Sequence, residues 1–308
     1  MNTQPQQTQG HGKDKGNKAA ATPAGGTTIT PPPTETAIEV LDYDGDAGGG
    51  FELQTMADRK MPLIVVLQAN SPTVAESKGK YHAGQFQNSV TGEVFDEITF
   101  VPAITDRCWL EYLPRVEDGS GGGFRGRHSY DSKIVAAAIA KNDGRAIGKV
   151  PLLSKDRTGK DEMHELVESF EVYSILYIGS DMTGFGVISF TSTKIKAYKA
   201  WNTQLAHFAP KIGQRQFKTG EIPLFAHRVK MTTELDQRGK LSWWIPVLAP
   251  ATGGDDLVKS LLPQSDVRYQ AAKKLKEEVR KGLAKVAYES TQSDAPAGGA
   301  VDESDVPF

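Results

Sequence analysis

Residues 170–193, FEVYSILYIGSDMTGFGVISFTST, contain two runs of β-branched and aromatic residues, 170–179 and 184–193, separated by turn-forming residues. Such runs are typical of strands, because branched and aromatic side chains pack well on a pleated surface. Similar runs recur on both sides of this stretch. We therefore predict a largely β core, with further strands at residues 62–68, 82–89, 93–104, 107–113, 224–233 and 240–248.

Three segments have helical patterns instead. Residues 131–143 offer Asp131 or Ser132 as a cap, and residues 192–208 offer Ser192 or Thr193 and stop before Pro210. In residues 265–289 apolar side chains recur at intervals of three and four, with lysines and arginines around them, which predicts an amphipathic basic helix. We expect this helix to pack on the core, with pairing to a second protomer or binding to DNA as alternatives.

The 308 residues suggest one domain with tails. Residues 1–36 and 291–308 are polar and rich in small residues, which predicts disorder. Between them we expect a core at 37–250 and a linker with the basic helix at 251–290. No apolar run approaches the roughly 20 residues of a membrane helix, and no secretory signal is visible. We expect a cytoplasmic protein whose single cysteine, Cys108, lies buried in a strand.

The charge is distributed unevenly along the chain. The formal net charge is only −2, but residues 191–230 carry eight lysines and arginines against Glu221 alone, a local charge of +7. Residues 291–308 carry four acidic side chains and no basic one, a local charge of −4. A basic middle and an acidic end in one chain suggest a polyanionic partner and a tail that competes with it.

Motifs of catalysis are absent from the sequence. SKDRTGKD (154–161) lacks the first glycine and the Ser or Thr of a phosphate-binding loop, and HELVE (164–168) has Glu168 where a zinc helix needs its second histidine. Neither C-x-x-C nor G-x-S-x-G occurs. We predict a protein that is not an enzyme and needs neither a metal nor a cofactor, with an unrecognised nuclease as the weakest alternative.

Aromatic residues are interleaved with the basic ones. Lysines attract phosphates at any sequence, and exposed rings stack on bases, so this combination suits single-strand binding without sequence choice. The glycine-rich arm at 119–128 adds an aromatic ring and two guanidinium groups, although an ordinary hairpin loop is the alternative. The candidate DNA-binding residues are Phe124, Arg125, Arg127, Lys194, Lys196, Lys199, Trp201, Lys211, Arg215, Lys218, Arg228, Lys230 and Trp243.

The pattern also supports structural roles for some of these aromatic residues. Ile195, Tyr198, Leu205 and Phe208 fall at helical spacing, which favours a core face over a stacking surface. Neighbouring strand positions point to opposite faces, so one tryptophan of the pair at 243 and 244 is expected in the core and the other outside it.

The last seven residues, DESDVPF (302–308), are an acidic run that closes on a hydrophobic residue, proline and phenylalanine. This ending resembles the tip of bacterial single-stranded DNA-binding proteins, whose tails end in several aspartates followed by Ile-Pro-Phe. The resemblance implies that the tip binds partner proteins, since a ring and a terminal carboxylate on one residue fit a small basic pocket. The matching residues are Asp302, Glu303, Asp305, Val306, Pro307 and Phe308.

The resemblance implies a core built on an oligonucleotide-binding (OB) barrel, here larger and with inserted helices. Two phrases, YLPRVEDGSGGGFRGRH and ISFTSTKIKAYKAWNT, are similar to segments of bacteriophage proteins, so we expect a phage-encoded relative. The expected function is sequence-independent binding and protection of single-stranded DNA in replication, recombination or repair, with recruitment of a polymerase, helicase, primase or nuclease through the tip. A strand-annealing recombination mediator and a virion or assembly protein are the alternatives.

Overall fold

The computed structural model describes residues 56–113, 123–142, 144, 149–155, 159–178, 181–239, 241–252 and 256–288. These residues belong to one compact unit, Leu53–Phe308. The predicted tails at 1–36 and 291–308 lie outside the described residues, and so do the six candidate residues of the tip.

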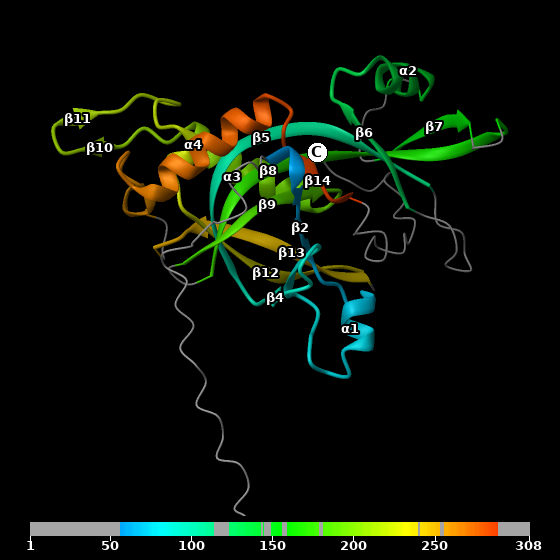
Figure 1. The fold of residues 1–308 in the computed structure, drawn as a ribbon, viewed down its shortest axis with the longest axis horizontal. Helices are drawn as coiled ribbons and strands as arrows, with labels where there is room; N and C mark the ends of the chain where they lie inside the picture. Colours follow the sequence, from blue (N-terminus) through cyan, green and yellow to red (C-terminus); the bar gives the residue numbers. More distant parts are fainter. Residues whose placement is uncertain are drawn as a thin grey trace, which may run out of the picture. The chain divides into compact units, whose positions relative to one another are not determined.

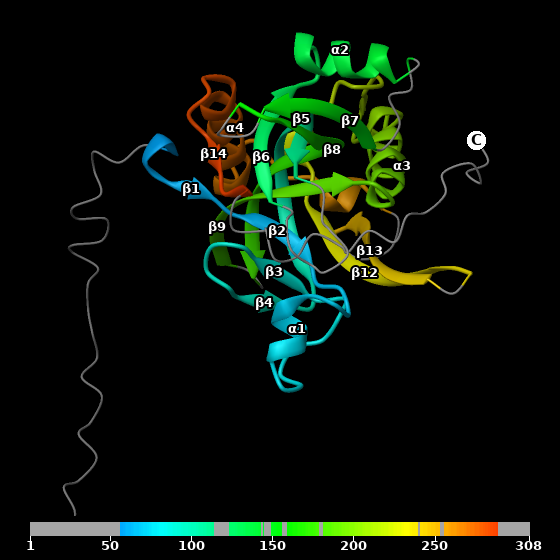
Figure 2. The same ribbon diagram turned by 90° about the vertical axis from the view of Figure 1, so that its right-hand side faces the viewer.

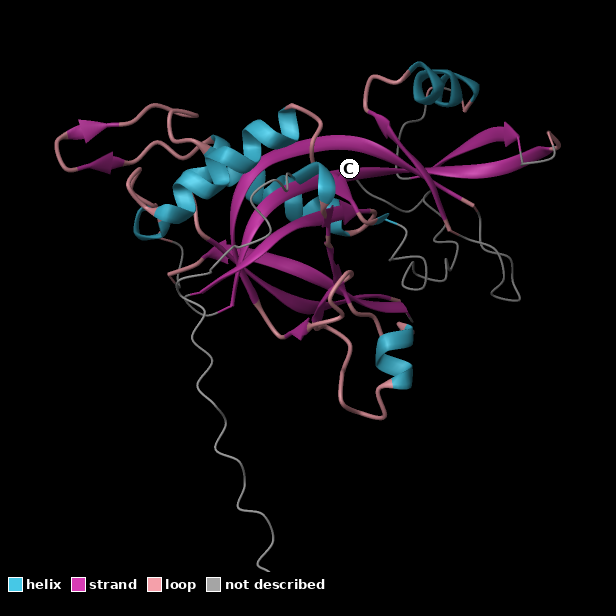
Figure 3. Cartoon of the chain, viewed as in Figure 1, coloured by secondary structure: helices cyan, strands magenta, loops and turns pink. Residues whose placement is uncertain are grey.

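One sheet dominates the unit (Figures 1 and 3). Its strands are β2 (Leu63–Val66), β3 (Phe86–Asn88), β4 (Val94–Phe95), β5 (Ile98–Tyr112), β6 (Phe124–Ser129), β7 (Lys149–Lys155), β8 (Asp161–Ile178), β9 (Asp181–Thr191), β12 (Val229–Arg238) and β13 (Leu241–Pro250). The order is β13-β12-β5-β8-β9-β2-β3-β4, with β6 also beside β5 and β7 also beside β8. The prediction of a mainly β fold is confirmed.

Helices and short strand pairs surround this sheet. The helices are α1 (Pro72–Glu76), α2 (Lys133–Lys141), α3 (Lys194–Ala206) and α4 (Val267–Arg280), with 3-10 turns η2 (Met56–Asp58), η3 (Leu224–Ala226) and η4 (Val258–Ser260). The short pairs join β1 (Lys60–Met61) to β14 (Lys285–Val286) and β10 (Lys211–Ile212) to β11 (Arg215–Gln216).

Strands β5 and β8 are the longest, with 15 and 18 residues, and they pair along most of their length. Each has two different neighbours on its other edge: β12 and then β6 beside β5, and β7 and then β9 beside β8. The sequence predicted two strands at 93–104 and 107–113. That division is wrong, because the ladder with β8 continues through a bulge between Pro102 and Ile104.

The connectivity is that of an OB fold. A meander of β5, β8 and β9 is followed by α3 and then by the β12–β13 hairpin, whose first strand returns to β5. No strand ladder closes the described sheet into a barrel. The amide of Gln68, just after β2, links that part of the sheet to the end strand β13 instead. Its Oε1 accepts from the N–H of Trp244 at 2.9 Å, and its Nε2 donates to the Trp244 carbonyl at 3.0 Å.

Helices α3 and α4 cover opposite faces of the sheet. Alternation along the strands sends Phe100 and Val172 toward Tyr198 and Trp201 of α3, and their neighbours Val101 and Tyr173 toward α4. Figure 2 shows α3 and α4 on different sides of the strands. A third cluster lies farther along β5 and β8 beneath α2, built from Trp109, Val135, Ala138, Val150 and Leu166.

The expected packing of the C-terminal helix on the core is confirmed. Ala272 and Leu275 of α4 are 0% and 1% exposed, and the Asp266 carboxylate caps the helix by accepting from the Arg268 N–H at 2.9 Å. The helix ends at Arg280 rather than 289, because Gly282 takes a φ of +72° and the chain then forms β14. Cys108 is buried, as predicted, and burial raises the pKa of its thiol.

Candidate nucleic-acid interface

The β10–β11 hairpin presents basic side chains to solvent. Lys211, Arg215 and Lys218 are all exposed, and Figure 1 shows this hairpin projecting beyond the sheet. The Arg215 guanidinium lies 4.3 Å from the centre of the Phe217 ring and also pairs with the Glu221 carboxylate. The hairpin therefore combines cations with a ring, as the sequence predicted for this segment.

Helix α3 divides its side chains between solvent and core. Lys196 and Lys199 are exposed, whereas Lys194 is half-buried and burial lowers the pKa of its amine. Trp201 is only 4% exposed and packs edge-on against Phe100 with ring centres 6.5 Å apart. The prediction of Trp201 as a stacking residue needs correction, because core side chains cover its ring.

The arm residues also have structural partners. The Phe124 ring stacks on Tyr288 with centres 4.6 Å apart, so the stacking face expected for a base is occupied by the protein. The Arg127 guanidinium bonds to Glu171 through Nε at 3.1 Å and to Asp106 through Nη2. Arg125 is exposed. Arg125 therefore remains a candidate, whereas Phe124 and Arg127 serve the fold.

Three candidates near β12 and β13 are half-buried. Arg228 donates to the carbonyls of Ser260 and Lys259 at 3.4 and 3.2 Å, and Lys230 pairs with Glu97 at 2.6 Å. Trp243 is half-buried too, with its indole N–H enclosed. Its neighbour Trp244 packs on the α3 side of the core, which agrees with opposite faces for this pair.

Sequence reasoning missed two residues, one of which, Arg107, approaches the same Phe170 ring as Lys199 of α3. Arg107 of β5 and Tyr130, just before α2, are in contact although 23 positions separate them. A charged residue within a strand was the available signal for Arg107. No local pattern marks Tyr130, because its contact depends on the pairing of β5 with β6.

A row of histidines and carboxylates lies near the far end of β5 and β8. His128 Nε2 is 2.6 Å from Glu111 Oε2, and His164 Nδ1 contacts the other oxygen of Glu111. Burial raises the pKa of Glu111, but the hydrogen bonds to the two histidines outweigh burial and lower it. The segment HELVE (164–168) lies in strand β8 rather than in a helix. Within the described residues no group of three or more His, Cys, Asp or Glu side chains has metal-binding geometry.

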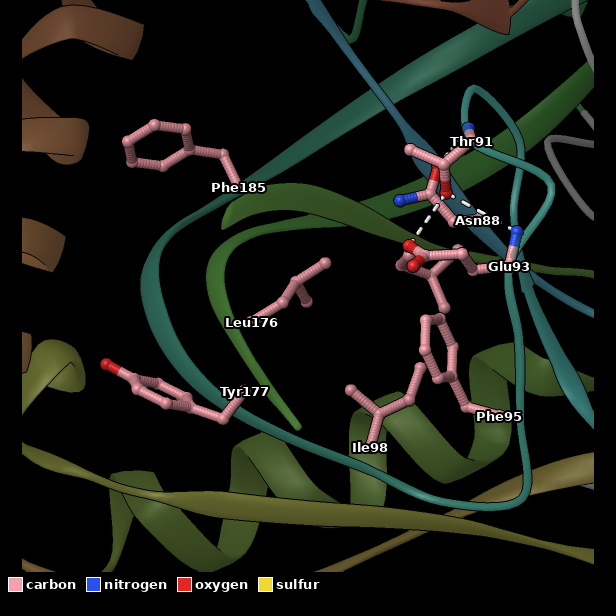
Figure 4. A pocket seen from close by; sticks show the side chains of 9 residues that line it. Asn88, Thr91, Glu93, Phe95, Ile98, Leu176, Tyr177 and Phe185 are labelled. Carbon is pink, nitrogen blue, oxygen red and sulfur yellow. Dashed lines mark hydrogen bonds between the residues drawn. The ribbon is translucent and has the colours of Figure 1, made fainter. Parts of the chain in front are cut away.

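A small hollow of about 60 Å³ lies between the β3–β4 turn and the strands opposite (Figure 4). The polar side chains that the turn contributes are engaged within it, whereas the Tyr177 hydroxyl on the opposite side is buried without a hydrogen-bond partner among the described residues. Asn88 Oδ1 accepts from the Thr91 N–H at 3.1 Å, and the Thr91 hydroxyl donates to Glu93 at 3.0 Å. These contacts assign the polar groups to the turn rather than to a ligand.

These features define a mainly β protein with OB-type connectivity and exposed cations on the β10–β11 hairpin and on helices α3 and α4. The family model described as Pam3 phage gp34-like protein matches residues 33–285, and the chain belongs to this family. No curated protein and no solved structure matches the chain. Among the helices of the described residues, none has the length and apolarity needed to cross a membrane.

Proposed function

We propose that this phage-family protein binds single-stranded DNA without sequence choice, protects it during replication or recombination, and recruits partner proteins through residues 302–308. The observation that supports this most is the set of exposed cations in the basic stretch. Lys196, Lys199, Lys211 and Lys218 are exposed and available to phosphates, and Arg215 is exposed beside them although it pairs with Glu221. The OB-type connectivity is a second support, because that fold often binds oligonucleotides.

Affinity for oligo-dT is expected to fall steeply as salt rises, because each phosphate contact releases counterions. Fluorescence anisotropy of a labelled oligo-dT at several salt concentrations measures this slope. Absence of salt-dependent binding contradicts the proposal and favours the virion or assembly alternative. Rings or filaments that form with single strands in electron micrographs favour the annealing alternative.

Charge reversal in the hairpin tests where the phosphates lie. The double variant Lys211→Glu/Lys218→Glu is expected to reduce the log–log salt slope by roughly 1.4, since each contact with a single strand contributes about 0.7. Lys273→Glu/Lys274→Glu is the matched control, because both lysines are exposed on α4. A salt slope for the hairpin variant equal to that of the unmodified protein would remove the hairpin from the interface.

Deletion of residues 302–308 tests the tail. This deletion removes three acidic side chains, and we expect affinity for oligo-dT to stay unchanged or to increase at low salt. Recruitment of the partner is expected to be lost. Anisotropy measures the first effect, and co-sedimentation with the replication proteins of the same phage measures the second. A truncated chain that binds its partner more tightly would contradict the assigned role.

A further inference from the structure

A continuous strip of cations and rings crosses β5 and β8 between α2 and α3. The Arg107 guanidinium lies 3.7 Å from the centre of the Tyr130 ring and 5.2 Å from that of Phe170. The Lys199 amine of α3 lies 5.8 Å from the same Phe170 ring. We call these four residues the Arg107 strip. Figure 2 shows α2 and α3 apart along the same long strands.

Tyr130 is the accessible ring of this strip. Its side chain is 47% exposed, and among the aromatic residues that the structure describes it alone falls in the exposed class. Phe170 is half-buried, with its ring stacked on Tyr198 at 4.7 Å between centres. One side of Tyr130 is held by Arg107, and its high exposure leaves surface for a second stacking partner.

Arg107 is itself fixed by a buried carboxylate. Its Nε donates to Glu168 Oε1 at 2.6 Å, and Glu168 is 6% exposed. The guanidinium is thereby held between the rings of Tyr130 and Phe170. A ring positioned before the ligand arrives loses little conformational entropy on binding, which favours a stacking role. Arg107 acts here as a positioning residue.

The opposite face of the sheet is covered. In OB folds the face of the second and third strands binds oligonucleotides, and those strands correspond to β8 and β9. On the α4 side, Ile175 of β8 and Val187 of β9 are both fully buried in the cluster that includes Leu275 of α4. The α4 side of these strands is therefore closed to DNA. On the α3 side Val172 and Ile188 are buried as well, and the half-buried Phe170 marks the part of β8 that DNA can reach.

We propose that a nucleobase of a bound single strand stacks on Tyr130 and that Lys199 and Lys196 bind the adjacent phosphates. This inference rests on the proposed function and specifies its base contact. Stacking is independent of base identity, because every base has a π-face. The neighbouring exposed lysines of α3 supply the charge complementarity that favours a DNA strand over a neutral or basic peptide, and the stacking ring suits a base.

Tyr130→Ala in the full-length protein tests the stacking. Its affinity for oligo-dT is expected to fall about 5- to 150-fold, the range that one lost base stack produces. The salt slope is expected to stay unchanged because no charge is removed. Tyr130→Phe keeps the ring and is expected to bind as the unmodified protein does. Tyr81→Ala is the matched control, since the Tyr81 ring also packs with a cation, 4.7 Å from Lys80.

Photo-crosslinking of the unmodified protein to iododeoxyuridine-substituted oligo-dT provides a second measurement that needs no variant. We expect the crosslink at Tyr130. Suppose that the unmodified protein binds oligo-dT with a salt-dependent affinity. If Tyr130→Ala then binds equally well, or if the crosslinks are confined to the β10–β11 hairpin, this inference is overturned and the proposed function stands. Unmodified protein without salt-dependent binding overturns the proposed function itself.

Discussion

Replacement of Arg127 by methionine is expected to lower the free energy of unfolding by about 3–5 kcal/mol, because it leaves a buried carboxylate without its charged partner. That carboxylate belongs to Glu171, which is 0% exposed. Its two oxygens also accept from the hydroxyls of Tyr288 at 2.5 Å and Tyr173 at 3.4 Å. Burial lowers the pKa of Arg127, but the Glu171 charge outweighs burial and raises it.

A double-mutant cycle with Glu171→Gln measures the pair itself. Glutamine keeps one acceptor oxygen, enough for one of the two tyrosine hydroxyls, and carries no charge, so Arg127→Met should cost much less in this background. Urea unfolding gives the four free energies. Equal costs in both backgrounds would show that Arg127 stabilises the fold by some other contact. In oligo-dT titrations Arg127→Met is expected to bind normally once folded, because its guanidinium is engaged inside the protein.

Gly84→Ala is expected to lower the free energy of unfolding by about 2–5 kcal/mol. Gly84 has a φ of +93°, and a Cβ there would lie 2.7 Å from Cε3 of Trp244. Positive φ costs an alanine about 1–2 kcal/mol, and the overlap with a packed indole adds about 1–3 kcal/mol. The substitution lies where the segment before β3 meets β12 and β13. There the Gly84 carbonyl accepts a hydrogen bond from the Thr233 hydroxyl at 2.6 Å.

Gly92→Ala separates the cost of a positive φ from the cost of overlap with the Trp244 ring. Gly92 has a φ of +75° but open space around the position of a Cβ, so only the backbone cost of about 1–2 kcal/mol applies. Chemical denaturation of both variants under the same conditions gives the comparison. Similar losses of unfolding free energy at the two positions would mean that the close approach of Gly84 to Trp244 contributes nothing to stability.

The local pattern predicted the secondary structure well. Runs of branched and aromatic residues marked most strands, and the caps and spacings located α2 and α3 within two residues of their observed ends. The errors occurred where pairing with a distant segment decides where a strand or helix ends. β5 continues through a bulge because β8 pairs with it throughout, and α4 stops early because β14 pairs with β1. Neither partner is visible from the neighbouring sequence.

The candidate interface was predicted in part. Exposed lysines on α3 and the hairpin followed from composition, because charged side chains on a polar helix face or a short hairpin remain in water. The aromatic residues were less predictable, since a ring serves equally well in a core or on a surface. Trp201 and Phe124 are packed against other rings, whereas Tyr130 is exposed.

The sequence by itself determined the mainly β class, the helix positions, the basic middle of the chain and its acidic end, because these depend on local periodicity and composition. Only the tertiary structure decided which side chains are free. Arg107 meets Tyr130, and Arg127 meets Glu171, across strands that are far apart in the chain. A guanidinium or a ring becomes a binding group or a structural one according to its neighbours in space, and strand pairing together with helix packing sets those neighbours.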